Sequence, residues 1–284
     1  MTAFRIACVQ MRASRDPSEN LAALEQQIRE AAGRGAAYVQ TPEMTNILVR
    51  SRGELMEAIV GEEADPTLAR VRVLAAELGV FVHLGSLAVL AGSDRVANRA
   101  FVVAPDGSIA ARYDKIHMFD VDLANGESWR ESATYRPGEA AVTVDLGPIV
   151  AGLAVCYDIR FPQLFRAYAK AGVGLLTAPA AFTRQTGEAH WHLLQRTRAI
   201  ENGAFLASAA QGGRHADGRE TYGHSLIVDP WGTVLAEADH DEPAVIVADI
   251  DPAMVATVRG RVPSLANERA FAAPDVAPLG GASP

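Results

Sequence analysis

A cysteine that ends an apolar run is the residue best placed to do covalent chemistry in this chain. The apolar residues 148–155 end at Cys156, and a charged, proline-bearing segment then leads into a helical pattern at residues 161–171. This order predicts a strand, a sharp turn and a helix, with the thiol at the turn. Such a turn exposes a side chain at the carboxyl edge of a sheet and directs backbone N–H groups toward whatever binds there. Cys156 is therefore a candidate nucleophile, with a buried core thiol as the alternative.

Three charged residues could complete the chemistry of a cysteine hydrolase. Glu43 follows an apolar run, whereas Lys115 and Glu131 lie in the long polar segment 115–137. A hydrolase of this kind must deprotonate the thiol, stabilise an oxyanion and protonate a leaving group. A glutamate can take the thiol proton and return it to the leaving amine, while a lysine ammonium stabilises the thiolate and the oxyanion. The backbone N–H of Tyr157 is a candidate for the second oxyanion donor.

Each of these residues also has an ordinary structural interpretation. Glu43 could be a solvated turn residue, Lys115 a surface charge and Glu131 a cap of its segment. A papain-like scheme would instead use His117 or His224 as the base. These interpretations lose ground only when the four residues are considered with their flanking motifs.

Alternating strand and helix patterns position these residues. We predict strands at 4–10, 36–41, 80–87, 98–104, 109–113, 149–155, 175–178, 205–209, 225–228, 234–238 and 245–249, and helices at 18–32, 65–78, 162–171 and 188–202. Ser18 is the predicted N-cap of the first helix, and Pro66 occupies the first position of the second. The two strand–helix halves lack a linker, so we expect one α/β domain over residues 1–270, with sheets covered on one face only. A loose tail rich in Ala, Pro and Gly is expected at 271–284.

Composition narrows the class of protein. The chain has 284 residues, 49% hydrophobic and 21% charged, which fits a globular enzyme. Its net charge of −8 argues against a nucleic-acid partner. The sequence has no apolar run of membrane-spanning length and no signal-peptide layout, so we expect a cytoplasmic protein with no membrane partner. Two cysteines do not make a disulfide framework, and Cys8 is expected to be a buried strand residue.

Three blocks resemble the catalytic blocks of the nitrilase superfamily of carbon–nitrogen hydrolases. They are Pro42-Glu43, residues 113–120 (YDKIHMFD) and residues 155–162 (VCYDIRFP), and the resemblance runs from residue 4 to about residue 263. It implies a four-layer α-β-β-α sandwich. It also implies an enzyme that hydrolyses linear amides without a metal or organic cofactor.

The resemblance assigns a role to each candidate residue. It implies that Glu43 is the general base, Lys115 the stabiliser of the oxyanion and Cys156 the nucleophile. Glu131 matches the second glutamate of the family, which positions the lysine and the substrate. With all four residues intact, a non-enzymatic scaffold protein is the weaker hypothesis.

Within the superfamily, the chain resembles the Nit-type amidase branch. This branch includes omega-amidases, which act on 2-oxoglutaramate, and deaminated glutathione amidases, which cut the 2-oxoglutaryl amide of Cys-Gly. Residues 210–215 (AQGGRH) are similar to the Ala-Gln-Cys-Gly-Arg-His stretch of the second group and favour it. Gly212 in place of that cysteine, and Gln40-Thr41 before Pro42, depart from the pattern. Omega-amidase, nitrilase and carbamoylase activities stay open as alternatives.

Both favoured substrates are anions, so an acidic protein needs a local cation to bind them. Arg160 could hold a carboxylate in a bidentate pair, and an ion pair with Asp158 is the alternative. The resemblance supports Arg160 in this role, with Phe182 and Thr186 lining the same end of the pocket beside Tyr157. It also favours a homodimer or larger homo-oligomer.

The histidines of the predicted helix 188–202 do not by themselves indicate a metal site. His190 and His192 are two residues apart, and this spacing points the two rings in different directions on a helix. We therefore expect no metal bound by this pair.

Overall fold

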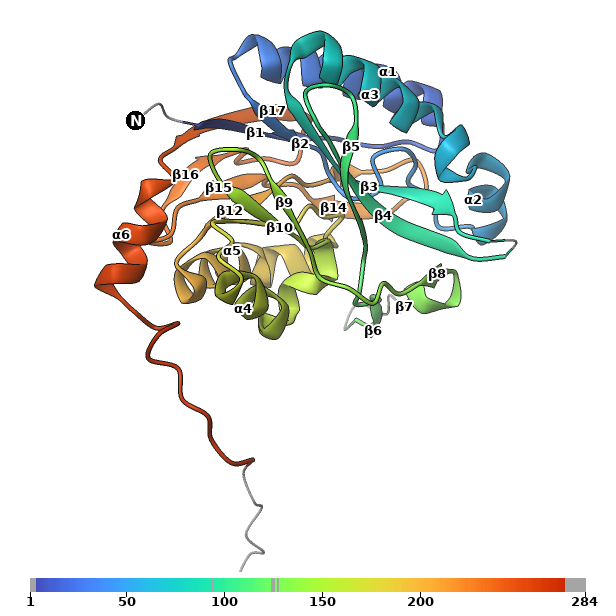
Figure 1. Ribbon diagram of the computed structural model, residues 1–284. Coiled ribbons are helices and arrows are strands. Elements are labelled where there is room, and N and C mark those ends of the chain that lie inside the picture. The colour runs from blue at the N-terminus through green and yellow to red at the C-terminus, as the bar shows by residue number, and fades with distance from the viewer. Residues whose placement is uncertain (1–3, 93, 124–125, 127, 274–284) are drawn as a thin grey trace, which may run out of the picture.

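The computed structural model describes residues 4–92, 94–123, 126 and 128–273, and it contains two facing β-sheets (Figure 1). The predicted tail at 271–284 therefore lies almost entirely outside the described residues. The first sheet has seven strands in the order β17-β1-β2-β3-β4-β5, with β8 paired to β4. They are β1 (Phe4–Gln10), β2 (Tyr38–Gln40), β3 (Phe81–Leu90), β4 (Val96–Val103), β5 (Ile109–Asp114), β8 (Tyr135–Arg136) and β17 (Ala244–Ile250).

Helices α1 (Pro17–Gly33) and α3 (Pro66–Leu78) cover the outer face of the first sheet (Figure 1). The Asp16 carboxylate, not Ser18, caps α1, and it accepts a hydrogen bond of 2.8 Å from the backbone N–H of Ser18. The predicted cap was wrong because Pro17 takes the first helical position, which places the cap one residue before it. Pro66 opens α3 as expected, after the N-cap Asp65.

The second sheet has six strands in the order β16-β15-β12-β11-β10-β9. They are β9 (Val142–Asp145), β10 (Val150–Leu153), β11 (Leu175–Thr177), β12 (Phe205–Ser208), β15 (Leu226–Val228) and β16 (Val234–Glu237). Its outer face carries α4 (Pro162–Lys170) and α5 (Arg184–Asn202) (Figure 1). Helix α5 begins four residues before the predicted start, where Thr186 and Gly187 are weak helix formers that hide the pattern.

Two large apolar cores hold these layers together, and a third, smaller cluster lies around Ile47 and Leu55. One lies between the sheets and joins residues such as Ile6 and Val102 of the first sheet to Leu153 and Leu206 of the second. The other lies between the first sheet and its two helices. The order helix, sheet, sheet, helix confirms the predicted four-layer α-β-β-α sandwich.

Shorter elements complete the described chain. The segment 115–137 is not a bare loop, because it contains the hairpin β6 (Asp120–Asp122) and β7 (Ser128–Arg130) and the 3₁₀ turn η2 (Glu131–Ala133). Strands β8 and β9 were not predicted either. The other elements that the sequence did not predict are α2 (Arg52–Ala58), η1 (Glu62–Ala64), η3 (Cys156–Arg160), the paired strands β13 (Gly212–Arg214) and β14 (Glu220–Tyr222), and α6 (Ala253–Arg261).

Candidate active site

A buried lysine between two glutamates forms the centre of the candidate site. Lys115 Nζ lies 2.9 Å from Oε1 of Glu43, and it lies 3.0 and 2.8 Å from Oε1 and Oε2 of Glu131. Only 2% of the Lys115 side chain is exposed. Glu43 follows β2 and Lys115 follows β5, so the carboxyl ends of two strands of the first sheet bring these residues together.

Asn98 is a member of this cluster that sequence reasoning missed. Its Nδ2 donates to Oε1 of Glu43 at 2.9 Å and to Oε1 of Glu131 at 3.0 Å. Two neighbouring carboxylates repel each other, and the asparagine and the lysine hold them at one place. A single asparagine within a strand pattern carries no local signal of such a role.

Cys156 sits at a strained turn of the second sheet. Its φ is +49°, in the left-handed region that residues with a side chain seldom occupy. Its backbone N–H donates to the carbonyl of Pro179 at 2.8 Å, which ties the turn to the segment after β11. Cys156 as a whole is 8% exposed, and it lines the same cavity as Lys115 and Glu43. The turn lies between β10 and α4, as predicted, but its cysteine faces a cavity instead of open solvent.

A buried aspartate holds this turn in place through hydrogen bonds. Asp158 Oδ2 accepts hydrogen bonds from the backbone N–H of Val155 at 2.9 Å and the hydroxyl of Tyr113 at 2.7 Å. Oδ1 contacts the backbone N–H of His117 at 3.0 Å and its ring Nδ1 at 2.6 Å. These partners occupy Asp158, so the alternative ion pair between Arg160 and Asp158 is not found.

Burial and charge set the protonation states of the cluster. Burial raises the pKa of Glu43, but the ammonium of Lys115 and hydrogen bonds from Lys115 and Asn98 outweigh it, so this pKa lies below its ordinary value. Burial lowers the pKa of Lys115, yet the charges of Glu131 and Glu43 hold it well above its ordinary value. Burial, followed by the charge of Glu43, holds the pKa of the Cys156 thiol well above its ordinary value. The resting cluster thus pairs a protonated thiol with an ionised glutamate and a charged lysine.

The four residues open onto a cavity of about 320 Å³. The predicted substrate contacts Tyr157, Phe182 and Thr186 line it, whereas Arg160 does not. The guanidinium of Arg160 lies next to two of these lining residues. Its carbon is 5.2 Å from the ring centroid of Phe182 and 5.9 Å from that of Tyr157. Both of its terminal nitrogens lie 3.3 Å from Nδ1 of His190. No carboxylate of the described residues pairs with Arg160.

Three other arginines, Arg50, Arg130 and Arg219, line the cavity and were missed. Arg50 and Arg219 each place their guanidinium carbon 4.5 Å from the ring centroid of Trp129. The Arg219 side chain is 14% exposed and its nearest carboxylate, of Asp217, is 3.6 Å away. Its Nε has no hydrogen-bond partner among the described residues. The sequence around Arg219 reads as a polar turn, which gives no sign that the chain folds it against the cavity.

The histidines of the papain-like alternative lie elsewhere. The ring of His117 bonds Asp158 and stacks on Phe161 with centroids 3.5 Å apart. His224 contacts Glu237. Neither residue is among those that line the cavity.

Of the described helices, none has the length and apolar character of a membrane span.

Comparisons with known proteins agree on one family. The family model "Carbon-nitrogen hydrolase" matches residues 5–260. The chain is 36% identical over 267 residues to the deaminated glutathione amidase of Yersinia enterocolitica, covering 93% of this chain and 92% of that protein. It is also 36% identical over 271 residues to the omega-amidase NIT2 of Homo sapiens, covering 95% and 96%.

A solved structure of an amidase also resembles this chain. It is a variant of the amidase from Nesterenkonia sp. AN1 that shows covalent addition of the acetamide moiety of fluoroacetamide at the active site cysteine. It superposes with a TM-score of 0.80 at 27% identity, covering 94% of both chains.

Proposed function

This chain belongs to the carbon–nitrogen hydrolase family, and from that membership we propose that it hydrolyses deaminated glutathione through a cysteine thioester. The bond cut is the amide between the 2-oxoglutaryl group and Cys-Gly. The observation that carries the proposal is the buried contact of Lys115 with Glu43 and Glu131 in the cavity that Cys156 lines. This arrangement supplies a base, a cation and a thiol at one point.

The first step is attack on the amide. The sulfur of Cys156 forms a bond to the carbonyl carbon, its proton passes to the Glu43 carboxylate, and the carbonyl electron pair moves to oxygen. The Lys115 ammonium and the backbone N–H of Tyr157 stabilise that oxyanion. The first N–H groups of a helix have no partner inside it, and Tyr157 lies in the first turn of η3.

The second step releases the amine. The oxyanion collapses, the carbon–nitrogen bond breaks, and Glu43 gives its proton to the departing nitrogen. A water molecule then loses a proton to Glu43 and attacks the thioester. The carbon–sulfur bond breaks, the 2-oxo acid leaves, and the proton on Glu43 returns to the thiol.

Glu131 and Asn98 position the reacting groups in this scheme. Glu131 accepts from Lys115 with both oxygens, which keeps the ammonium charged and directed toward the cavity. Its Oε2 also accepts from the backbone N–H of Phe119 at 2.7 Å, so Glu131 is itself held in place.

The cations near the cavity support an anionic substrate. Arg50 and Arg219 lie against Trp129, and Arg160 lies against Tyr157 and Phe182. Deaminated glutathione has two carboxylates, and two separate groups of arginines match that number. 2-Oxoglutaramate has one carboxylate and is the second candidate, favoured by the relatives named omega-amidase.

The test is a side-by-side measurement of kcat/KM for deaminated glutathione, 2-oxoglutaramate and glutamine. We expect the first to be the best substrate and glutamine the worst. A higher kcat/KM for 2-oxoglutaramate would select the alternative, and a higher value for glutamine would refute the 2-oxo acid assignment. Nitriles and N-carbamoyl compounds in the same panel test the remaining chemistries of the superfamily.

We also propose a homodimer in the cytoplasm, with no cofactor. Exposed apolar side chains gather on α5 and the β15–β16 hairpin, namely Leu193, Ile200, Trp231 and Leu235, and they suit a contact with a second copy. Cys8 and Cys156 are free thiols, as is usual in a reducing compartment. Light scattering on the protein as it elutes from a size-exclusion column measures its molar mass and so gives the oligomeric state.

A further inference from the structure

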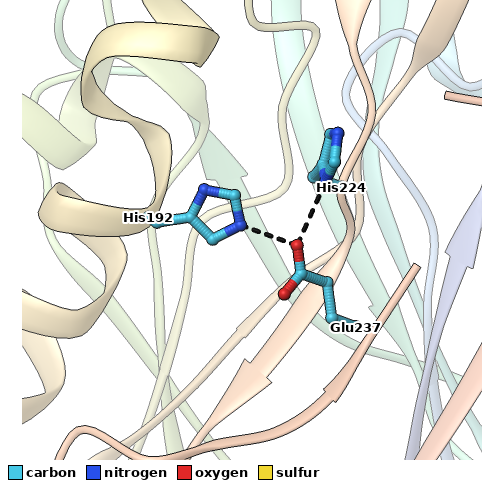
Figure 2. A group of neighbouring side chains, drawn as sticks. All are labelled: His192, His224 and Glu237. Atoms are coloured by element: carbon cyan, nitrogen blue, oxygen red, sulfur yellow. Dashed lines mark hydrogen bonds and ion pairs between the residues drawn. The ribbon is translucent and has the colours of Figure 1, made fainter. Parts of the chain in front are cut away.

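Three side chains outside the active site converge on one point (Figure 2). His192 lies on α5, His224 lies between β14 and β15, and Glu237 ends β16. Nε2 of His192 is 2.6 Å from Oε1 of Glu237, and Nδ1 of His224 is 3.1 Å from the same oxygen. The three atoms all lie within 4.8 Å of one another. None of the three residues is among those that line the active-site cavity.

We propose that His192, His224 and Glu237 bind a divalent transition-metal ion, with zinc as the best match. Two imidazole nitrogens and one carboxylate oxygen are ligands that Zn²⁺ takes at about 2.0–2.2 Å. Tetrahedral geometry at that length places ligand atoms roughly 3.3 Å apart. To admit the ion, the two contacts with Glu237, of 2.6 and 3.1 Å, would lengthen toward this value, and the two imidazole nitrogens, which lie within 4.8 Å of each other, would adjust to it as well.

Protonation is consistent with this use of the cluster. The Glu237 carboxylate accepts a hydrogen bond from Nε2 of His192 and another from Nδ1 of His224. On binding, a neutral ring keeps its proton on the nitrogen that faces away and directs its other lone pair to the ion. The side chains are partly exposed, at 36%, 22% and 25% for His192, His224 and Glu237, which leaves a side open for a water ligand.

The two rings are held in place before any ion arrives. Tyr222 stacks on His224 with centroids 4.2 Å apart, and it meets His192 edge-on at 6.0 Å. The backbone of His224 has a φ of +54°, and its carbonyl accepts a hydrogen bond of 2.8 Å from Nε1 of Trp191. Because these contacts fix the rings, little side-chain freedom remains to be lost on binding.

This site differs from the pair that the helical spacing excluded. His190 contacts Arg160 and takes no part, whereas the partners of His192 come from segments more than thirty residues away in the chain. A bound ion would join α5 to the edge of the second sheet. Since binding to the folded state alone stabilises it, the ion would act as a structural clip.

The experiment measures binding of Zn²⁺ and of Co²⁺ to the full chain. It uses Cys156→Ala protein, so that the active-site thiol is not a competing ligand. We expect one Zn²⁺ per chain by calorimetry, a higher Tm with Zn²⁺, and visible Co²⁺ absorption typical of tetrahedral coordination. Adding His192→Ala or Glu237→Gln should weaken Zn²⁺ binding at least about tenfold, or about 1.4 kcal/mol.

His240→Ala is the matched control, because His240 is an exposed histidine outside the cluster. It should bind Zn²⁺ as the parent does. Equal affinity of the His192→Ala and His240→Ala proteins would overturn the proposal, as would the absence of saturable binding in the parent. Glu237→Gln keeps the shape of the side chain and its hydrogen-bonding ability, and circular dichroism verifies that each variant is folded.

Discussion

Asn98 and Lys115 donate hydrogen bonds to the same two oxygen atoms, Oε1 of Glu43 and Oε1 of Glu131. The lysine brings charge to the pair of carboxylates, and the asparagine brings only a donor. The Oδ1 atom of Asn98 has no hydrogen-bond partner among the described residues. The residue thus serves the cluster through its Nδ2 group, and this permits a clean test of its part.

Asn98→Leu keeps the branching of the side chain and removes that donor. Because the hydrogen bond lowers the pKa of Glu43, its loss should raise this pKa. The base works in its ionised form, so the acid limb of kcat/KM against pH should move to higher pH. We expect about a ten- to hundredfold loss of kcat near neutrality. Asn202→Leu removes a buried asparagine outside the site and should leave the pH profile in place; an unmoved profile in Asn98→Leu would contradict the role.

Glu43→Gln should separate the acidity of the thiol from turnover. The charge of Glu43 raises the pKa of Cys156, so its removal should lower this pKa. Turnover should nevertheless fall by about 10³-fold or more, because no base is left to carry the proton. Titration of the thiolate by its ultraviolet absorbance, beside steady-state kinetics, measures both effects. Retained turnover, or a thiol pKa that rises, would exclude the assigned base.

The sequence was sufficient for the fold class and for four charged or nucleophilic residues that meet at the cavity. Its strand–helix alternation and the three motif blocks depend on local order, which a sequence displays directly. Lys115, Glu43, Glu131 and Cys156 lie close together, as the resemblance implied, although their chemical roles stay predictions.

The contributions of Asn98 and Arg219 could not be predicted, because each depends on contacts between segments far apart in the chain. A lone asparagine in a strand, or an arginine in a polar turn, looks the same whether it faces solvent or a cavity. The cluster of His192, His224 and Glu237 could not be predicted for the same reason, since its three members come from a helix, a connecting segment and a strand.

Arg219→Gln should change substrate preference more than catalysis. Arg219 lines the cavity, and deaminated glutathione has a glycine carboxylate that 2-oxoglutaramate lacks. We expect KM for deaminated glutathione to rise about tenfold or more, with little change for 2-oxoglutaramate. Arg160→Gln should raise KM for both, because they share the 2-oxo acid end. Arg130→Gln, at a lining residue already paired with Asp122, is the control. An equal rise for both substrates in Arg219→Gln would refute its selectivity.

Gly85→Ala should disrupt the site through packing alone. A Cβ at Gly85 would lie 2.1 Å from the carbonyl oxygen of Thr41 and 2.5 Å from Cβ of Pro179. Those segments lead to Glu43 and hold the backbone of Cys156, so the two sheets cannot separate there without moving the base from the thiol.

We expect the free energy of unfolding to fall by about 1–3 kcal/mol or more, together with a loss of kcat. Gly33→Ala is the matched change, since a Cβ there meets no atom within 4 Å. It should stabilise or be neutral, because alanine restricts the unfolded chain. Urea unfolding of both variants decides the matter: if Gly85→Ala unfolds at the same midpoint as the parent, the close approach of the two sheets does not set the geometry of the site.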